Sequence, residues 1–192
     1  MSRYGAISRR LVNADPDDAE MVMELAYTLV NLGALEMARR DPDIEYALEL
    51  TQSAVQYHQI ALVLDPENAL WRKELAGTVA FLADAWLETC DLGKTFDFRQ
   101  QRLDLARELY DASPEDNGLV SELAYALSGM ASVQQLIPML DQALANLQQA
   151  YVLLDQLATQ ESGNRKRRWQ ALVRLRALQR FCFRYLPGLR RQ

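Results

Sequence analysis

A repeated sequence marker at nearly constant spacing is the feature that most constrains this fold. Three copies share a Glu-Leu-Ala core, and their leucines are Leu25, Leu75 and Leu123. A fourth, more divergent copy aligns on Ala171, so that successive markers lie 50, 48 and 48 residues apart. A fixed period of this length is typical of repeat proteins, in which each repeat is one supersecondary unit. We therefore expect the 192 residues to form one run of repeats.

The residues just before each core predict where one helix ends and the next begins. An Asp-Pro or Ser-Pro pair precedes the first three cores, as in Asp15-Pro16. Proline cannot continue a helix, and the residue before it avoids the helical region. A short polar residue follows each pair and suits the N-cap or first turn of the next helix. These residues are Asp18, Asn68, Asn117 and, in the fourth copy, Asn164.

Each interval also contains a second helix after a short break. The breaks are expected at residues 40–43, 91–94 and 137–139, and the second helices at about 44–64, up to about 110, and 140–157. Ala, Leu, Glu, Gln and Arg dominate the composition and favour helices. The sequence therefore predicts an all-α chain of antiparallel helical hairpins, which must stack because one hairpin cannot bury its apolar stripe alone.

The apolar pattern of the first helices resembles the tetratricopeptide repeat. Leu25, Ala26 and Leu29 match the large, small and large positions of that family, and Ala54, Ala61 and Pro66 match those of its second helix. The family repeats every ~34 residues, whereas these units repeat every 48 to 50, and Arg72 and His58 replace expected apolar or aromatic residues. The resemblance implies a right-handed solenoid in a single domain. Its parts would be residues 1–14 (a partial return helix), 15–64, 65–112 and 113–160 (three repeats), and 161–192 (a capping helix).

The string from Asp65 to Ala76 resembles the long tetratricopeptide-like arrays of bacterial signalling proteins. This resemblance implies a protein-interaction scaffold that acts as a regulatory or sensory module and binds a partner helix, a peptide or an adjacent effector domain. Residues 4–13 read as the end of a return helix, so we expect the chain to be the C-terminal piece of a longer protein. Homo-oligomers are a further expectation, because the ends of such an array expose apolar helix faces.

The resemblance also indicates which residues would line the concave, partner-binding face. Small and aromatic side chains at these positions suit a docked helix or peptide, and plain packing between helices is an equal alternative. Glutamates recur at one position of each repeat, where they either receive basic side chains or solvate and cap their helices. The predicted face comprises Glu24, Tyr27, Val30, Asn31, Lys73, Glu74, Gly77, Phe81, Glu122, Tyr125 and Ser128.

Charge is distributed unevenly along the chain. Residues 1–161 contain all 26 acidic residues and 11 basic ones, whereas residues 162–192 contain ten basic residues and no acid. The densest basic patch is Arg165, Lys166, Arg167 and Arg168. It reads as a solvated cap that pairs with the acidic body, as a docking face for an acidic protein, or as a binding site for nucleic acid or an anionic surface.

The sequence shows no set of residues that indicates a catalytic or cofactor-binding site. His58 is the only histidine, so the chain offers no Ser-His-Asp set with a spare base and no multi-histidine metal site. We expect His58 to pack or to lie at the surface, and predict no enzyme activity, metal or cofactor. The two cysteines, Cys90 and Cys182, are expected to be buried and reduced. No signal peptide or membrane-spanning run is visible, which predicts a cytoplasmic protein.

Overall fold

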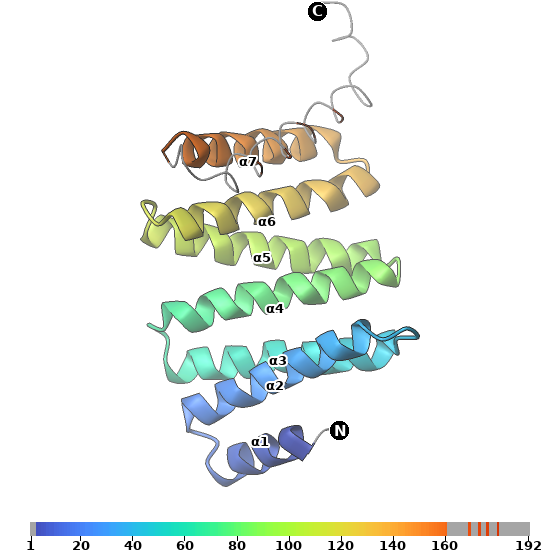
Figure 1. The fold of residues 1–192 in the computed structure, drawn as a ribbon, viewed down its shortest axis with the longest axis vertical. Helices are drawn as coiled ribbons and strands as arrows, with labels where there is room; N and C mark the ends of the chain where they lie inside the picture. The colour runs from blue at the N-terminus through green and yellow to red at the C-terminus, as the bar shows by residue number, and fades with distance from the viewer. Residues whose placement is uncertain (1–2, 161–168, 170–172, 174–175, 177–179, 181–192) are drawn as a thin grey trace, which may run out of the picture. The chain divides into compact units, whose positions relative to one another are not determined.

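The computed structural model describes residues 3–160 and, beyond them, residues 169, 173, 176 and 180. Residues 3–160 form seven helices and no strand, so the predicted all-α class is confirmed for this part of the chain (Figure 1). The helices are α1 (Arg3–Ala14), α2 (Ala19–Met37), α3 (Ile44–Leu64), α4 (Ala69–Glu88), α5 (Leu92–Ala112), α6 (Asn117–Leu136) and α7 (Leu140–Gln160).

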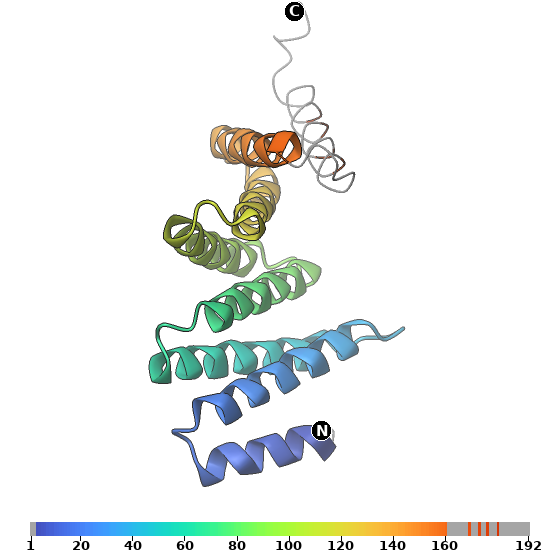
Figure 2. The same cartoon turned by 60° about the vertical axis from the view of Figure 1, so that its left-hand side comes forward.

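The chain divides into two compact units, Met1–Leu105 and Ala106–Gln192, with the boundary inside α5. In unit 1, each of α1 to α3 packs against the next helix along the chain, and α2 and α4 also touch (Figures 1 and 2). In unit 2, α6 packs against α7. Packing of helices against their sequence neighbours is the arrangement of a helical-repeat fold built from stacked antiparallel hairpins.

Short polar side chains begin the helices, as the sequence markers predict. Asp18 and Asn68 are the N-caps of α2 and α4, where their side-chain oxygens accept from Met21 N–H at 3.0 Å and Trp71 N–H at 3.2 Å. At α6 the cap is Asp116, and Asn117 is the first helical residue. Each cap satisfies backbone N–H groups that have no partner within the helix. Asn164 lies outside the described residues.

Removing the cap of α4 tests this account. We expect Asn68→Ala to lower the free energy of unfolding by about 1 kcal/mol, because Trp71 N–H loses its acceptor. Chemical denaturation measures the change. The control is Gln56→Ala on the exposed side of α3, which should stay within about 0.5 kcal/mol of the parent. Equal effects of the two substitutions would contradict a capping role for Asn68.

The carboxylate of Glu36 fixes the loop that joins α2 to α3. Glu36 is only 11% exposed in its side chain and accepts from Arg39 at 2.8 and 3.0 Å and from the backbone N–H of Asp43 at 3.0 Å. The Asp43 N–H and the Arg39 side chain lower the pKa of Glu36, because both favour its charged form. The loop therefore has a defined path between the two helices of this hairpin.

The junction between α4 and α5 differs from the sequence prediction. Helix α5 already begins at Leu92, so the break is shorter than the expected residues 91–94. Asp91 caps it, since its side chain accepts from Lys94 N–H at 3.0 Å. Cys90 stands between the helices with φ of 61°. The prediction of a buried thiol is wrong for Cys90, which is exposed, because a left-handed residue at a helix end lies in the turn rather than on a packed helix face. Cys182 lies outside the described residues.

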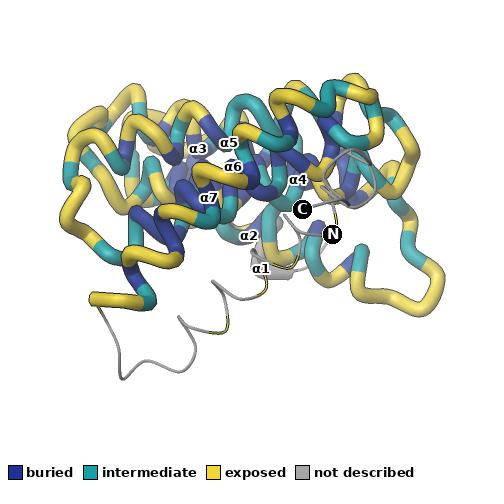
Figure 3. The backbone as a smooth tube through the Cα atoms, turned by 90° about the horizontal axis from the view of Figure 1, so that it is seen from above, coloured by how far each residue is buried: buried dark blue, intermediate teal, exposed yellow. Residues whose placement is uncertain are grey.

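The core of unit 1 includes two hydrophobic clusters that share α3. The first cluster joins α1, α2 and α3, and the second joins α3, α4 and the start of α5. Ala54 and Ala61 of α3 belong to the first cluster, whereas Leu48 and Val55 belong to the second. Figure 3 shows that buried residues recur along the helices, whereas exposed residues predominate in the loops. In unit 2, Ala131 of α6 and Leu147 of α7 are part of one small cluster.

Candidate functional site

Two neighbouring helices of unit 1 bring most of the predicted partner-binding residues together. We define the α2/α4 face as the predicted residues on these helices that the structure leaves at least partly exposed, apart from the aliphatic Val30. Its members are Glu24, Tyr27 and Asn31 on α2, and Lys73, Glu74, Gly77 and Phe81 on α4. Spacings of three and four residues place each set on one side of its helix. Because α2 touches α4, the two sets form one continuous surface.

Two carboxylates of this face raise the pKa of one phenol, that of Tyr27. Burial raises the pKa of Tyr27, and the negative charges of Glu74 and Glu24 raise it further. Glu24 and Glu74 come from successive repeats, 50 residues apart, so equivalent positions of two repeats bring both carboxylates close enough to affect the same phenol. Tyr27 therefore stays neutral and keeps its hydroxyl proton at neutral pH. The surroundings of its ring are negatively charged.

Gly77 leaves the middle of this face open. It occupies the position on α4 that Tyr27 occupies on α2. An added Cβ at Gly77 would meet no atom within 4 Å, and its φ does not lie in the left-handed region that favours glycine. Neither packing nor backbone conformation therefore explains a glycine in the interior of this exposed helix, where it is less stable than alanine. Its distinguishing property is that the backbone is accessible.

The remaining residues of the predicted partner-binding set lie outside the α2/α4 face. Val30 is half-buried and packs against the first cluster, as does the ring of Tyr27, so packing between helices accounts for part of the predicted set. In unit 2, Glu122 and Tyr125 are half-buried on α6. Ser128 is 7% exposed, and its hydroxyl donates to the carbonyl of Ala124 at 2.8 Å. We leave Ser128 out of the proposed face because its side chain is engaged inside the helix layer.

His58 is a buried residue that contacts Tyr27 of the α2/α4 face. It is fully buried, in agreement with a packing role, and its ring meets Tyr27 edge to face with centroids 5.8 Å apart. Its Nε2 lies 3.0 Å from Thr78 Oγ1 on α4. One repeat earlier, Ser8 and Thr28 make the equivalent contact at 3.5 Å. This polar seam was not predicted, although both pairs are separated by 20 residues and recur at the 50-residue period.

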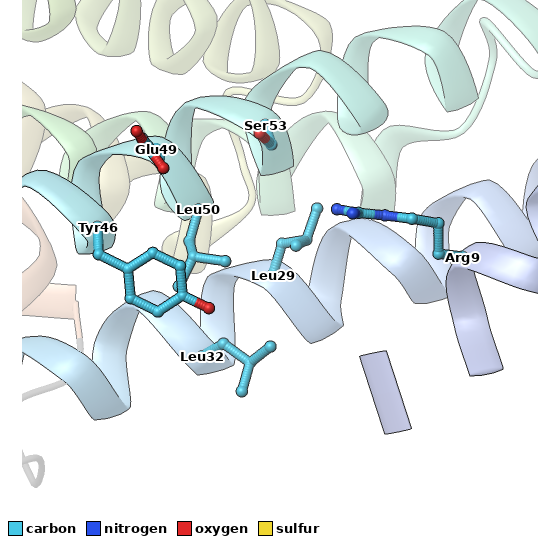
Figure 4. A pocket seen from close by; sticks show the side chains of 7 residues that line it. All are labelled: Arg9, Leu29, Leu32, Tyr46, Glu49, Leu50 and Ser53. Atoms are coloured by element: carbon cyan, nitrogen blue, oxygen red, sulfur yellow. The ribbon is translucent and has the colours of Figure 1, made fainter. Parts of the chain in front are cut away.

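A pocket on another side of unit 1 was also not predicted. It has a volume of about 220 Å³ and lies between α1 and α3, over α2. Figure 4 shows leucine side chains beside the ring of Tyr46, with Arg9 extending from α1 and with Glu49 and Ser53 on α3. The lining residues are Arg9, Leu29, Leu32, Tyr46, Glu49, Leu50 and Ser53. They come from three helices and form no local sequence motif, so only the tertiary structure brings them together.

The described residues were searched for a metal site and for a membrane-spanning helix. Within residues 3–160 and the four described residues beyond them, no group of three or more His, Cys, Asp or Glu side chains is placed to hold a metal ion. No helix in this part of the chain has the length and apolar character that crossing a bilayer requires. The basic patch at residues 165–168 lies outside the described residues and stays a prediction.

Comparison with known proteins gives likenesses of fold only. No protein-family model and no curated protein matches this chain. The structure of a MamA RS-1 ArsTM double mutant aligns with 92% of this chain and 83% of its own, at 14% identity and a TM-score of 0.48. BtubC (BKLC) from P. vanneervenii aligns with 93% of this chain and 87% of its own, at 14% identity and a TM-score of 0.39.

Proposed function

We propose that this chain is a protein-interaction scaffold that binds a partner helix or peptide on the α2/α4 face. The observation that carries the proposal is the gathering of Glu24, Glu74 and Tyr27 from two successive repeats beside the open backbone of Gly77. Two carboxylates and an aromatic ring within reach of one ligand segment suit binding rather than chemistry. A ring held by His58 adds a rigid contact surface at low entropic cost.

The charges of the face define the chemistry of the partner. A lysine or arginine in the partner would lie between the two glutamates, and an apolar neighbour would pack on the rings of Tyr27 and Phe81. Gly77 allows a partner backbone or small side chain to approach α4 closely, because no Cβ stands in the way. The expected ligand is therefore a basic and apolar segment. Electrostatic complementarity would mainly set its specificity and association rate.

The wider role follows from the sequence resemblance and is part of the same proposal. The string from Asp65 to Ala76 supports assignment to a tetratricopeptide-like array, lengthened in this chain to a repeat of 48 to 50 residues. Such an array would serve a larger bacterial signalling protein in the cytoplasm as a regulatory or sensory module. The ligand segment would then belong to a separate protein or to an adjacent effector domain.

A peptide selection tests the proposed function. A random peptide library displayed on phage is selected against the purified chain, and the dissociation constants of the enriched peptides are measured by fluorescence anisotropy. We expect enrichment of Lys or Arg next to apolar residues. Glu24→Gln/Glu74→Gln should weaken binding by about tenfold or more, because both carboxylates lose their charge. Gly77→Leu should weaken it by blocking close approach.

The control is Glu45→Gln/Glu49→Gln, which removes two exposed carboxylates from α3. This variant has the same net charge as the Glu24/Glu74 variant, and we expect it to bind the peptides as the parent does. Equal weakening in both double variants would show that binding depends on overall charge and not on the α2/α4 face. Peptides without basic residues that compete for the face would also contradict the proposed ligand class.

A further inference from the structure

Helix α3, in the interior of unit 1, carries an exposed surface without charge. We define the α3 stripe as four exposed residues that share one side of this helix at helical spacing, Gln56, Gln59, Ile60 and Val63. Ile60 is 45% exposed and Val63 is 79% exposed, whereas the other sides of α3 pack on α2 and α4. Residues 50–64 contain no Asp, Glu, Lys or Arg, so the uncharged stretch spans about four turns of helix.

The next repeat shows what these positions carry when they face water. Helix α5 is the second helix of that repeat, and its terminal Ser113-Pro114 follows Asp65-Pro66 of α3 by 48 residues. At this offset the positions of the α3 stripe correspond to four exposed residues that are all charged, Asp104, Arg107, Glu108 and Asp111. Contact with water therefore explains the charges of α5 but not their absence from α3. Depletion of charge is the compositional signal of the buried centre of a protein interface.

The charge of the chain favours a second copy as the occupant of this surface. Residues 1–161 contain 26 acidic and 11 basic residues, so two copies that meet through most of their surfaces repel each other. The α3 stripe brings no like charges together when it meets another copy of itself. Its pattern is also self-complementary. In an antiparallel pair with Ile60 near the two-fold axis, Val63 of one copy would lie against the aliphatic part of Gln56 of the other.

We propose that the α3 stripe is the contact surface of a symmetric dimer, in which α3 of one copy packs antiparallel on α3 of a second copy. The contact uses the same residues on both copies, so the assembly closes at two copies and does not grow further. Burial of Ile60 and Val63 supplies the driving force. The dimer would carry two α2/α4 faces, which could bind two segments of one partner with increased avidity.

Charges at the two ends of the α3 stripe favour the antiparallel order. Glu49 precedes the stripe, Glu67 follows it, and both are exposed. A parallel pair would place each glutamate directly against its counterpart in the other copy, which costs free energy. An antiparallel pair centred on Ile60 avoids that direct opposition. Apolar contact therefore sets the affinity of the dimer, and the flanking glutamates set its orientation.

Sedimentation velocity of the full chain tests the proposal at concentrations from about 1 to 500 μM. We expect a reversible equilibrium between monomer and dimer, with no larger species. Gln56→Glu/Gln59→Glu adds charge with almost no change of shape, at positions where α5 carries charge. It should lower the association constant by about tenfold or more, because like charges then meet across the two-fold axis. Val63→Glu should have the same effect.

The control variant is Leu35→Glu, which places the same charge at another exposed apolar residue, 67% exposed on α2. It should dimerise as the parent does, and circular dichroism should show unchanged helix content in all variants. Equal weakening by Leu35→Glu and Val63→Glu would overturn the proposal, because association would then depend on general surface charge. A parent chain that stays monomeric would also overturn it and would leave a different protein as the occupant of the α3 stripe.

Mixing experiments test the symmetry and the orientation of the contact. Gln59→Glu and Gln59→Lys should each dimerise weakly alone, and an equimolar mixture should form a mixed dimer, because opposite charges then meet near the axis. Failure of the mixture to associate would refute a symmetric contact.

Oxidative cross-linking distinguishes the two orientations in a chain that carries Cys90→Ser/Cys182→Ser. Gln56→Cys mixed with Val63→Cys should form a disulfide-linked dimer, and Val63→Cys alone should not. The reverse result would indicate a parallel pair and contradict the proposal. Glu24→Gln/Glu74→Gln on the α2/α4 face should leave dimerisation unchanged, so this proposal and the proposed function succeed or fail independently.

Discussion

Gly33→Ala is expected to destabilise unit 1 by about 1 to 3 kcal/mol, although alanine is the better helix former. Gly33 lies inside α2, at a position that faces α3. A Cβ at this position would lie 2.7 Å from Thr51 Oγ1 and 3.3 Å from the carbonyl oxygen of Ala47. The first distance is shorter than any van der Waals contact, so either the Thr51 side chain or one of the two helices must move.

The neighbours of Gly33 cannot move at little cost. Thr51 is fully buried, its β-branched side chain has few rotamers, and its hydroxyl donates to the carbonyl of Ala47 at 2.8 Å. Turning Thr51 away would break that hydrogen bond inside the core. The backbone of Ala47 is held by its own helix. The added methyl group is therefore accommodated by separating α2 from α3, which loosens the first hydrophobic cluster.

Gly77→Ala is the matched control, because it makes the same change in the equivalent type of helix. Its Cβ would meet open space, so the substitution should stabilise the chain by about 0.5 to 1 kcal/mol. Urea unfolding of the two variants measures both signs in one experiment. A Gly33 variant as stable as the parent would show that α2 and α3 do not approach as closely as the structure indicates.

Acidification is expected to destabilise the chain through His58 by up to about 3 kcal/mol. Burial lowers the pKa of His58 from its ordinary value of 6.5 to about 4. Thr78 Oγ1 donates to the carbonyl of Glu74 at 3.1 Å, so we infer that its oxygen accepts from His58 Nε2–H. His58 Nδ1 is then the basic nitrogen, and it is buried without a hydrogen-bond partner. A proton there would bring a charge into a site with no acceptor.

The sign of the effect follows from the two pKa values. Between pH 6.5 and about 4, the unfolded chain binds a proton at His58 that the folded chain does not bind. Stability therefore falls as the pH falls through this window, and this contribution levels off once the folded state is protonated too. Above pH 6.5 the contribution is constant, because His58 is neutral in both states.

Carboxyl groups titrate in part of the same range, so the measurement compares two proteins. Urea titrations at several pH values give the free energy of unfolding of the parent and of His58→Met. Methionine fills a similar volume and has no titratable group. The difference between the two curves isolates His58, and we expect it to change between pH 6.5 and 4. Parallel curves would show that water reaches the ring and that His58 is not protected from protonation.

The sequence predicts the helices well because their ends depend on local chemistry. The predicted helix at residues 44–64 is α3 itself, and the breaks at 40–43 and 137–139 separate the observed helices. Proline pairs and short polar caps act within a few residues, so a linear reading detects them. Cys90 is the exception, since its left-handed conformation ends α4 in a three-residue junction that lies before Gly93, earlier than the break expected at residues 91–94.

The site was predicted less completely because it depends on contacts between repeats. The repeat placed Glu24 and Glu74 at equivalent positions, but the sequence did not show that both would act on Tyr27. The role of His58 beneath that ring requires three helices to be in place. The recurrence of Ser8, Thr28, His58 and Thr78 at one period was available as a signal, and it would have identified the seam between repeats.

The position of α3 in both hydrophobic clusters limits how unit 1 can be divided or rebuilt. A modular protein is usually recombined by exchanging whole hairpins. Here residues 44–64 belong both to the cluster with α1 and α2 and to the cluster with α4 and α5. A hairpin transplanted from another protein must therefore fit the neighbouring helices on both of its sides. The interchangeable block is thus not the pair α2 and α3 alone. It also includes the surfaces of α1 and α4 against which these two helices pack.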